Sequence, residues 1–366
     1  MRYDPASRAG AVLEIDLGAI VANWQMLAAK ATPARCAAVV KANGYGLGAA
    51  RVAGALAAAG CRRFYTATLD EGIALRAALG PEPEIAVFNG PMPGSIVEFV
   101  TTRLIPVLNE PSQVEAWESV TATDKPPAIV HIDTGLNRLG LSQAEFAALT
   151  DRLRRPGCTM LISHLACAEA PDHPLNTQQR DRFLAVRQLL PGLEASLAAS
   201  SGIFLGPDYH FDEVRPGAAL YGVNPCPGQP NPMRPVVRLS ARIVQLRKID
   251  RGESVGYGAA HVMDGPGILA TVAIGYADGW PRSLSHRGCG WLAGKRVPLL
   301  GRVSMDLATF DVSAVDPSAL HPGATIELLG NKYGVDDAAA DAGTIGYEIL
   351  TSLGARFHRV YREPAI

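Results

Sequence analysis

The chain of 366 residues has almost no excess charge and few charged residues of either sign. Its 34 Lys and Arg nearly balance 35 Asp and Glu, for a formal net charge of −1. Nucleic-acid binding needs a surplus of cations to neutralise phosphates, so we expect no nucleic-acid partner. Charged residues make up only 19% of the chain and hydrophobic residues 48%, the reverse of a disordered composition. The length therefore predicts roughly two domains with a sizeable core.

Long apolar runs and paired cysteines are also absent. No stretch approaches the roughly 20 apolar residues of a membrane helix, and the start, MRYDPASRAG, has no signal-peptide core. The six cysteines form no CxxC pair and no Cys/His group with zinc spacing. In a chain of this length they are read as buried apolar residues or free thiols, which suit a reducing compartment. We expect a cytoplasmic protein with no membrane partner and no metal.

Up to about residue 230, short apolar runs alternate with amphipathic stretches rich in Ala and Leu. The runs are short and contain β-branched residues, which is typical of strands buried on both faces. They span 37–40, 64–67, 85–88, 104–108, 128–132, 160–163, 194–198 and 214–220. Helix candidates include 70–79, 143–153 and 176–190, the last with Asn176 or Thr177 as its cap. This α/β alternation predicts a (β/α)8 TIM barrel, with a doubly wound open sheet as the alternative.

The pattern changes near residue 235. Runs such as VVRLSARIVQLRKI and GILATVAIGYA are separated by Gly, Pro and Asp, which predicts a mostly antiparallel β domain with a helical end. The segment NPCPGQPNPMRP, with five prolines, is the natural linker. We therefore expect a barrel over 13–232 and a C-terminal β domain over 233–366. The N-terminal segment 1–12 is expected to join that β domain.

Catalytic groups of a barrel gather at the C-terminal ends of its strands. Lys41 directly follows the apolar run CAAVV, so it is expected at the mouth of a buried strand. A lysine there has a lowered pKa or forms a covalent imine, although pairing with a carboxylate is the alternative. SSG at 200–202 and RPGA at 215–218 can offer backbone N–H groups to a phosphate. A lysine imine opposite a phosphate cradle favours pyridoxal phosphate.

The other motifs are less specific. GYGLG after Lys41 matches neither the dinucleotide fingerprint nor the P-loop. DTG at 133–135 occurs once, which favours an ordinary turn over an aspartic protease. His164 and Arg215 end two strands at the same face of the barrel, though a lone histidine is more often a satisfied polar residue. Glycines beside a tyrosine let a ligand approach closely, but packing residues are the alternative for both Tyr257 and Tyr276.

Eight segments together resemble the alanine racemase family, in order and across nearly the whole chain. They are AVVKANGYGLGA, DTGLNRLGL, SHLACAEAPDHPLNTQQ, DEVRPGAALYGVNP, GESVGYGAAH, ATVAIGYADGWPRSL, GRVSMDLATFDVS and AGTIGYEIL. The resemblance implies a pyridoxal-phosphate enzyme with an eight-stranded barrel followed by a β domain. The barrel and the β domain inferred from the pattern agree with it.

The resemblance also implies roles for individual residues. Lys41 would hold the cofactor covalently and act as one catalytic base, with Tyr257 of the partner subunit as the other. Cofactor binding is implied for Lys41, Tyr45, His164, Ser200, Arg215, Gly217, Ala218 and Tyr347. Substrate binding is implied for Arg138, Met305 and Tyr276. The implied assembly is a homodimer with shared active sites.

Four positions depart from the family pattern. Many members have a carbamylated lysine where His131 stands, so Arg138 must be held otherwise, with Asn137, alone or with a bound anion or water, as a candidate. Leu47 replaces a common histidine, Ala199 a common asparagine and Ser304 a common cysteine. None of these changes removes a residue that is expected to transfer a proton.

The resemblance implies racemisation of L- and D-alanine by two bases, supplying D-alanine for peptidoglycan. A racemase of serine or of broader specificity is the alternative, because a methylene or hydroxyl is discriminated weakly. A non-catalytic pyridoxal-phosphate carrier would lack the second domain. A nucleotide-dependent dehydrogenase would carry the missing dinucleotide fingerprint.

Overall fold

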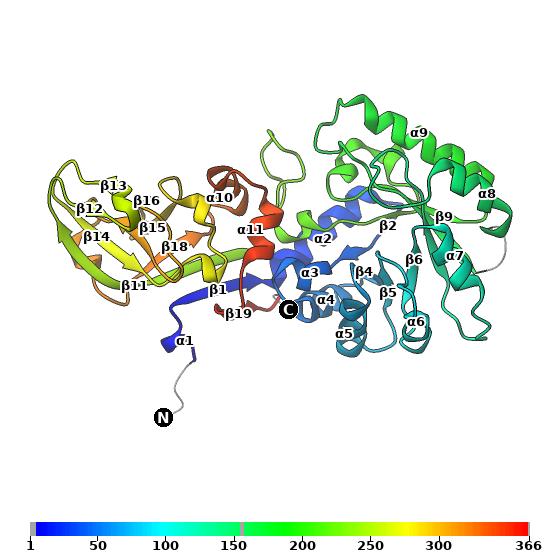
Figure 1. Ribbon diagram of the computed structural model, residues 1–366, viewed down its shortest axis with the longest axis horizontal. Coiled ribbons are helices and arrows are strands. Elements are labelled where there is room, and N and C mark those ends of the chain that lie inside the picture. Colours follow the sequence, from blue (N-terminus) through cyan, green and yellow to red (C-terminus); the bar gives the residue numbers. More distant parts are fainter. Residues whose placement is uncertain (1–4, 154–156, 365–366) are drawn as a thin grey trace. The chain divides into compact units, whose positions relative to one another are not determined.

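The computed structural model describes residues 5–153 and 157–364, which form two compact units (Figure 1). The barrel unit is Ile20–Arg234. The β unit joins the segment up to Ala19 to the segment that starts at Pro235. The domain limits predicted from the sequence, 1–12, 13–232 and 233–366, remain a prediction about which parts fold independently.

Parallel strands form the centre of the barrel unit. Within the described residues they follow one another in the order β3-β4-β5-β6-β7-β8-β9, each parallel to the next. Phe64, Ile85 and Val107 are fully buried on them, as the continuous apolar runs predict for a parallel sheet. Their bounds are Ala38–Val39, Arg63–Thr66, Glu84–Val87, Ile105–Leu108, Ala128–His131, Cys158–Ile162 and Glu194–Ser196.

Two short strands close the ring. β2 (Arg35–Cys36), just before β3, pairs in parallel with β10 (Glu213–Val214). On the other flank, backbone N–H groups at 212 and 215 donate to carbonyls at 195 and 198, both at 2.9 Å. The predicted TIM barrel is confirmed. The eighth strand is shorter than the predicted 214–220, because Pro216 has no N–H for a ladder and the chain turns into a 3-10 helix, η3 (Ala218–Tyr221).

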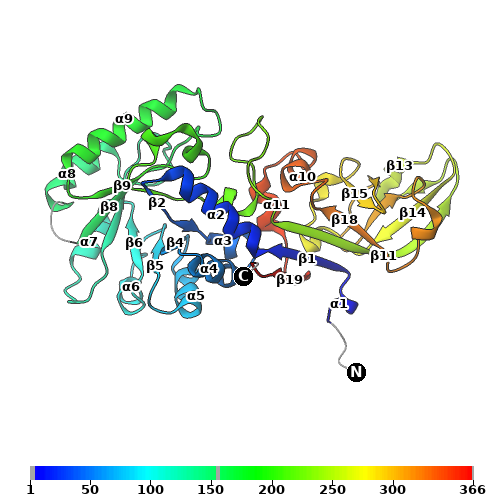
Figure 2. The same cartoon turned by 180° about the vertical axis from the view of Figure 1, so that it is seen from behind.

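Helices lie outside the parallel sheet of the barrel unit (Figures 1 and 2). The helix α9 begins earlier than the predicted cap at Asn176 or Thr177. Pro174 takes its first helical position, and the His173 side chain accepts the N–H of Leu175 at 3.2 Å. Their bounds are α2 Leu17–Ala31, α3 Lys41–Tyr45, α4 Ala49–Ala58, α5 Leu69–Leu79, α6 Ile96–Thr101, α7 Pro111–Glu118, α8 Gln143–Leu153 and α9 Pro174–Leu189.

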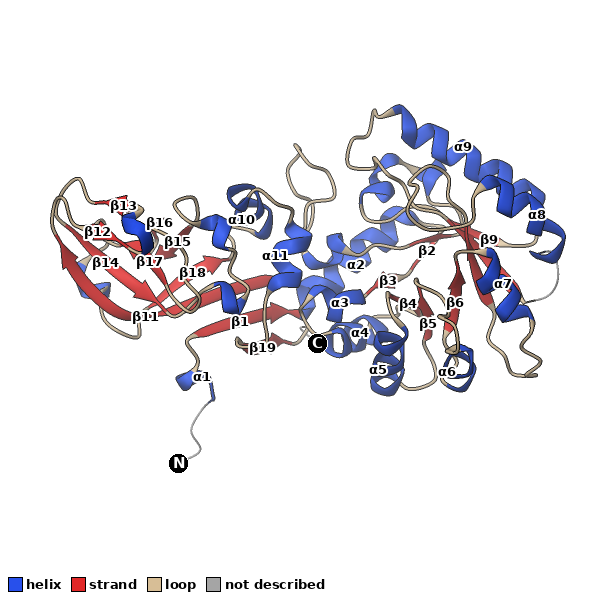
Figure 3. Ribbon diagram, in the orientation of Figure 1, coloured by secondary structure: helices blue, strands red, loops and turns tan. Residues whose placement is uncertain are grey.

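The β unit is mostly antiparallel, as predicted (Figure 3). Its long strand β11 has an irregular register between Ile243 and Gln245, and it pairs with both β18 and β14. The described order β14-β17-β16-β15-β18-β11 therefore closes on itself, and β1 and β19 extend it from β11. Bounds are β1 Ala11–Asp16, β11 Val237–Ile249, β12 Ser254–Val255, β13 His261–Val262, β14 Gly267–Val272, β15 Cys289–Leu292, β16 Lys295–Leu300, β17 Ala308–Asp311, β18 Thr325–Leu329, β19 His358–Arg362, α1 Pro5–Arg8, α10 Val335–Ala342 and α11 Gly346–Ser352.

In the part of the chain that the structure describes, no helix has the length and apolarity to cross a membrane. The same residues hold no group of three or more His, Cys, Asp or Glu suited to a metal ion. All six cysteines are free thiols.

Candidate active site

Lys41 stands at the C-terminal end of β3, as the sequence predicts. The strand before it is buried, and the Lys41 side chain is half-buried with Nζ 5.8 Å from the ring centroid of Phe88. Burial, and then the charge of Arg138, lower the pKa of Lys41, while Glu71 acts in the opposite direction. A lowered pKa raises the neutral fraction of the amine, the form that acts as nucleophile or base.

The segment α3 is a left-handed turn immediately after Lys41 rather than a regular right-handed helix. Ala42, Asn43 and Tyr45 have φ values of 53°, and Gly44 has a φ of 64°. Left-handed backbone costs roughly 1–2 kcal/mol per residue that is not glycine, so the surrounding contacts must hold this turn in place. Strain of this kind collects at functional sites, and here it lies next to the candidate lysine.

A cradle of hydrogen-bond donors surrounds Ser200. Its buried hydroxyl accepts the backbone N–H groups of Gly217 at 3.0 Å and Ala219 at 3.1 Å. With two bonds accepted, its own hydrogen is left to donate. Tyr45 closes the cradle: its ring stacks on Tyr221 at 4.5 Å, and a Cβ added at Gly217 would lie 2.3 Å from its hydroxyl.

Two short 3-10 helices start at this cradle. η1 (Ser201–Leu205) follows Ser200, and η3 begins at Ala218 directly after Gly217. The first N–H groups of a helical turn have no carbonyl partner within it. Together with the Ser200 hydroxyl they form a donor set of the kind that a phosphate requires.

Arg215 is the buried cation of the site, with 3% of its surface exposed. One Nη donates to the carbonyl oxygen of Ser163 at 2.6 Å and the other to the hydroxyl of Ser196. Burial lowers the pKa of Arg215, but a guanidinium ordinarily titrates so far above neutrality that it stays charged. Arg215 therefore donates hydrogen bonds and cannot accept a proton.

His164 lies in the same electrostatic neighbourhood. Among the described residues no hydrogen bond joins His164 to Arg215. Burial, and then the charge of Arg215, lower the pKa of His164 to about 3, so its imidazole is neutral. Arg138, His131 and Lys41 act on His164 in the same direction, so the barrel brings these groups near one another.

The Arg138 loop is fixed at its base. The Leu141 N–H donates to the His131 carbonyl there at 2.8 Å, and the Asp133 side chain accepts the N–H groups at 135 and 136, which makes DTG an ordinary turn. Arg138 and Asn137 are both exposed, and within the described residues no hydrogen bond joins them. Asn137 has a φ of 56°. The suggestion that Asn137 braces Arg138 is therefore unsupported.

The remaining predicted residues belong to the β unit. Tyr257 lies at the tip of the β12–β13 hairpin and is 73% exposed. Val255 and Met263 at the base of the hairpin pack in a buried cluster with Ile249 and Leu269. The hairpin therefore holds the exposed Tyr257 hydroxyl at its tip while its base is packed in the core of the β unit.

Tyr276 and Met305 occupy neighbouring loops of the β unit. The N–H of Tyr276 donates to the Ser304 carbonyl at 3.0 Å, and that of Ala277 donates to the Met305 carbonyl at 2.9 Å. Both predicted side chains are exposed. Tyr347 lies half-buried on α11.

Two residues of this region, Glu71 and Asn109, were not predicted from the sequence. Glu71 accepts the N–H of Ala42 at 2.7 Å, and Asn109 Oδ1 lies 2.9 Å from His131 Nδ1. The spacing of Thr68 and Glu71 is a recognisable capping box, but it shows nothing about Ala42. Of the departures from the family pattern, Leu47 is fully buried, and the Ser304 hydroxyl donates to the Leu307 carbonyl at 2.7 Å.

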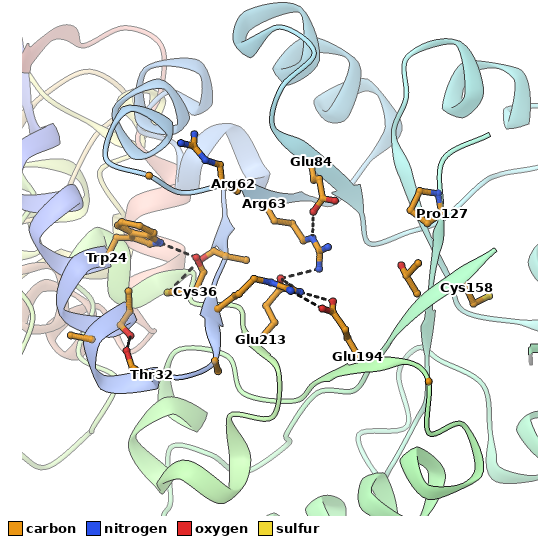
Figure 4. A pocket seen from close by; sticks show the side chains of 18 residues that line it. Trp24, Thr32, Cys36, Arg62, Arg63, Glu84, Pro127, Cys158, Glu194 and Glu213 are labelled. Atoms are coloured by element: carbon orange, nitrogen blue, oxygen red, sulfur yellow. Dashed lines mark hydrogen bonds and ion pairs between the residues drawn. The ribbon is translucent and has the colours of Figure 1, made fainter. Parts of the chain in front are cut away.

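A cavity of about 1000 Å³ lies at the opposite end of the barrel (Figure 4). Arg63, Glu84 and Glu213, which line it, are the first residues of β4, β5 and β10. Arg63 binds Glu84 at 2.7 Å and Glu213 at 2.9 Å. The N-terminal end of a barrel serves stability, and these three charged side chains are paired with one another.

Family models match both parts of the chain. The alanine racemase N-terminal domain matches residues 15–225, and the alanine racemase C-terminal domain matches residues 236–361. This chain belongs to the alanine racemase family. Its named relatives are isomerases, so the predicted enzyme class is confirmed.

Individual alanine racemases resemble the chain over nearly its full length. The catabolic alanine racemase of Mesorhizobium japonicum is 53% identical over 96% of this chain and 93% of its own. The alanine racemase of Rhodospirillum rubrum is 51% identical over 97% of this chain and 96% of its own. The crystal structure of the Bartonella henselae alanine racemase, with covalently bound pyridoxal phosphate, is 41% identical, has a TM-score of 0.92, and is matched over 97% of this chain and 100% of its own.

Proposed function

We propose that this chain interconverts L- and D-alanine with pyridoxal phosphate as cofactor. The observation that carries the proposal is the arrangement of the barrel unit. A half-buried lysine with a lowered pKa and a donor cradle both lie where the strands end, in a member of the alanine racemase family. Serine or broader specificity was the alternative from the sequence, and the names of the relatives favour alanine.

The residues of the barrel unit fit the cofactor. Lys41 would hold it covalently. Tyr45, the Ser200 hydroxyl and the N–H group of Ala218 would bind its phosphate, with Gly217 leaving room beside the Tyr45 hydroxyl and Tyr347 as a further proposed contact. Arg215 would face the ring nitrogen of the cofactor and donate a hydrogen bond to it, because a guanidinium has only hydrogen-bond donors and cannot accept a proton. Bound pyridoxal phosphate would supply a conjugated ring that takes up the electron pair left when the substrate loses its α-proton.

Inverting a stereocentre requires proton transfer on both faces of the substrate. Lys41 would serve one face, because burial and Arg138 lower its pKa. Tyr257 of the partner subunit would serve the other. A phenol ordinarily titrates near 10, so Arg138 would stabilise its anion and also bind the substrate carboxylate. Tyr276 and Met305 would line the pocket.

The proposed assembly is a homodimer in which each active site needs both chains. Support comes from the β unit, where Tyr257, Tyr276 and Met305 are exposed on anchored loops. The loops of Tyr276 and Met305 are neighbours, and a group of exposed large side chains is typical of a surface that a partner covers.

The first test is spectroscopic and enzymatic. The purified protein should have a visible absorbance band that disappears on borohydride reduction and is missing in Lys41→Ala. Optical rotation should be lost from L-alanine faster than from L-serine. A band without racemisation would point to a carrier, no band would overturn the cofactor, and faster loss with serine would reverse the specificity.

The second test mixes two inactive variants. Lys41→Ala and Tyr257→Phe, co-expressed with different tags, should give mixed dimers with one intact site of two. If the variants pair at random, the mixture should recover about a quarter of wild-type activity, whereas each variant alone recovers almost none. No recovery in purified mixed dimers would show that Tyr257 acts within its own chain.

We further propose that the enzyme works in the cytoplasm and supplies D-alanine for peptidoglycan. Free cysteines suit that compartment, and the similar Pseudomonas aeruginosa enzyme is named biosynthetic, although the Mesorhizobium japonicum relative is named catabolic. Cells that lack the gene should need added D-alanine to grow. Normal growth without it, in a strain with no second racemase, would favour the catabolic role.

A further inference from the structure

Glu71 links two separate backbone segments through one carboxylate. One oxygen accepts the N–H of Ala42 at 2.7 Å, and the other accepts the N–H of Ala67 at 2.9 Å and that of Thr68 at 3.4 Å. Thr68 in turn accepts the N–H of Glu71 at 3.3 Å, which completes the capping box of α5. An ordinary capping box ends there. The bond to Ala42 is an addition.

The added bond falls on the residue that starts the left-handed turn. Lys41 lies between the end of β3 and this turn, so its backbone is fixed from both sides. On the strand side, Val40 donates its N–H to the carbonyl oxygen of Tyr65 at 2.9 Å. On the turn side, Gly44 donates to Val40 at 2.8 Å, and Glu71 holds the N–H of Ala42.

We propose that Glu71 is a positioning residue: its carboxylate holds the left-handed turn at Ala42 and thereby sets the placement of Lys41. The turn places Ala42, Asn43 and Tyr45 in a conformation that L residues disfavour. Without the carboxylate bond, the chain after Lys41 relaxes toward a right-handed conformation, and the lysine loses its fixed direction. The negative charge of Glu71 also acts on Lys41, because it opposes the lowering of the Lys41 pKa by burial and by Arg138. The role of Lys41 itself rests on the proposed function.

The chain contains a matched control. Glu145 forms the same capping box at the start of α8. Its carboxylate accepts the N–H of Ser142 at 2.8 Å, and the Ser142 hydroxyl accepts the N–H of Glu145 at 3.3 Å. No bond from Glu145 to the Lys41 turn is present among the described residues. Thr68→Ala is a second control, because it weakens the α5 cap and leaves the carboxylate of Glu71 in place.

Amide hydrogen exchange on the protein as purified tests the proposal without reference to activity. In Glu71→Ala, exchange across residues 42–48 should accelerate about tenfold. In Glu145→Ala the increase should be confined to the start of α8, and in Thr68→Ala to the start of α5. Unchanged exchange over 42–48 in Glu71→Ala, or an equal increase there in Thr68→Ala, would overturn the proposal.

Kinetics separates positioning from general loosening of the fold. In Glu71→Ala, kcat should fall about tenfold with KM changed less than about twofold, because misplaced groups impair the transition state more than binding. Glu71→Gln keeps one oxygen acceptor and should recover part of kcat. Both control variants should keep wild-type kcat, and a fall in the Glu145 control would show that only helix capping matters. If the wild type did not racemise alanine, the proposed function would fail while the exchange result still stood.

Discussion

Asn109 accepts the Nδ1 hydrogen of His131 at 2.9 Å inside the barrel. The direction of this bond is set by Asn109, whose amide nitrogen donates to the carbonyls of Phe88 and Val107, both at 2.9 Å. Its oxygen is therefore the acceptor, and Nδ1 of His131 carries the hydrogen. The neutral form of His131 is therefore the tautomer with its hydrogen on Nδ1 and a lone pair on Nε2.

Acid should destabilise the protein through this histidine. Burial, and then the charge of Arg215, lower the pKa of His131 to about 4 from an ordinary value near 6.5. A lowered histidine pKa gives stability that is present above pH 6.5 and is lost as the pH falls toward 4. The loss for His131 amounts to about 3 kcal/mol over that window.

Urea unfolding at several pH values measures this effect. His131→Gln should flatten the dependence of unfolding free energy on pH between 6.5 and 4. His321→Gln, at an exposed position of the β unit, should leave it unchanged. An equally steep acid limb in His131→Gln would show that other groups govern acid unfolding.

A methyl group at Gly217 should weaken cofactor binding. The added Cβ would lie 2.3 Å from the Tyr45 hydroxyl and 3.4 Å from Val39 Cβ, and Tyr45 is buried and stacked on Tyr221. The ring must therefore move out of the proposed phosphate cradle. We expect Gly217→Ala to raise the Kd for pyridoxal phosphate about tenfold or more, measured by titrating the visible band.

Gly54→Ala is the matched control. Gly54 lies within α4, and an added Cβ there meets nothing within 4 Å. Alanine in a helix is favoured over glycine, so this variant should gain about 0.5–1 kcal/mol of stability with unchanged cofactor affinity. Wild-type affinity in Gly217→Ala would remove Tyr45 and Gly217 from the proposed cradle.

The sequence predicts the parallel strands of the barrel well because each is a continuous apolar run. The sequence does not correctly predict the two strands that close the ring of the barrel. β2 is only Arg35–Cys36, too short and too polar to stand out, and β10 stops at Val214 although the apolar run continues. These two strands pair only because the ring brings the chain back to its start, which is a property of the whole fold.

The candidate site divides in the same way. Lys41 and Ser200 could be found because each follows a buried strand at the catalytic end of a barrel. Glu71 and Asn109 could not, because each acts on a residue 29 or 22 positions away in the chain. Local patterns predict helix caps and strands, whereas bonds between neighbouring strand ends depend on the closed barrel.

The buried ion pair at the N-terminal end of the barrel should be important for stability. Arg63 Nη1 lies 2.9 Å from Glu213, whose side chain is 1% exposed and also accepts the Tyr65 hydroxyl at 2.6 Å. Arg63→Met would leave that carboxylate buried without this partner. We expect a loss of about 3 kcal/mol in the free energy of unfolding in urea.

Arg152 provides the comparison. It pairs with Glu115 and Glu118 on the surface of the barrel unit, where water screens the charges. Arg152→Met should keep the wild-type urea midpoint. Equal losses in the two variants would show that burial does not strengthen the Arg63 pair.

Arg215 should control which reaction follows proton removal. A guanidinium cannot protonate a ring nitrogen, whereas a carboxylic acid at this position could, which would stabilise the negative charge longer. Arg215→Glu should therefore raise transamination relative to racemisation, measured as pyruvate formed per alanine racemised. The ratio does not depend on how much of the variant folds. Ser196→Ala removes an acceptor of Arg215 but keeps its charge, so the ratio should stay at the wild-type value. An unchanged ratio in Arg215→Glu would mean that this guanidinium does not set the fate of the substrate.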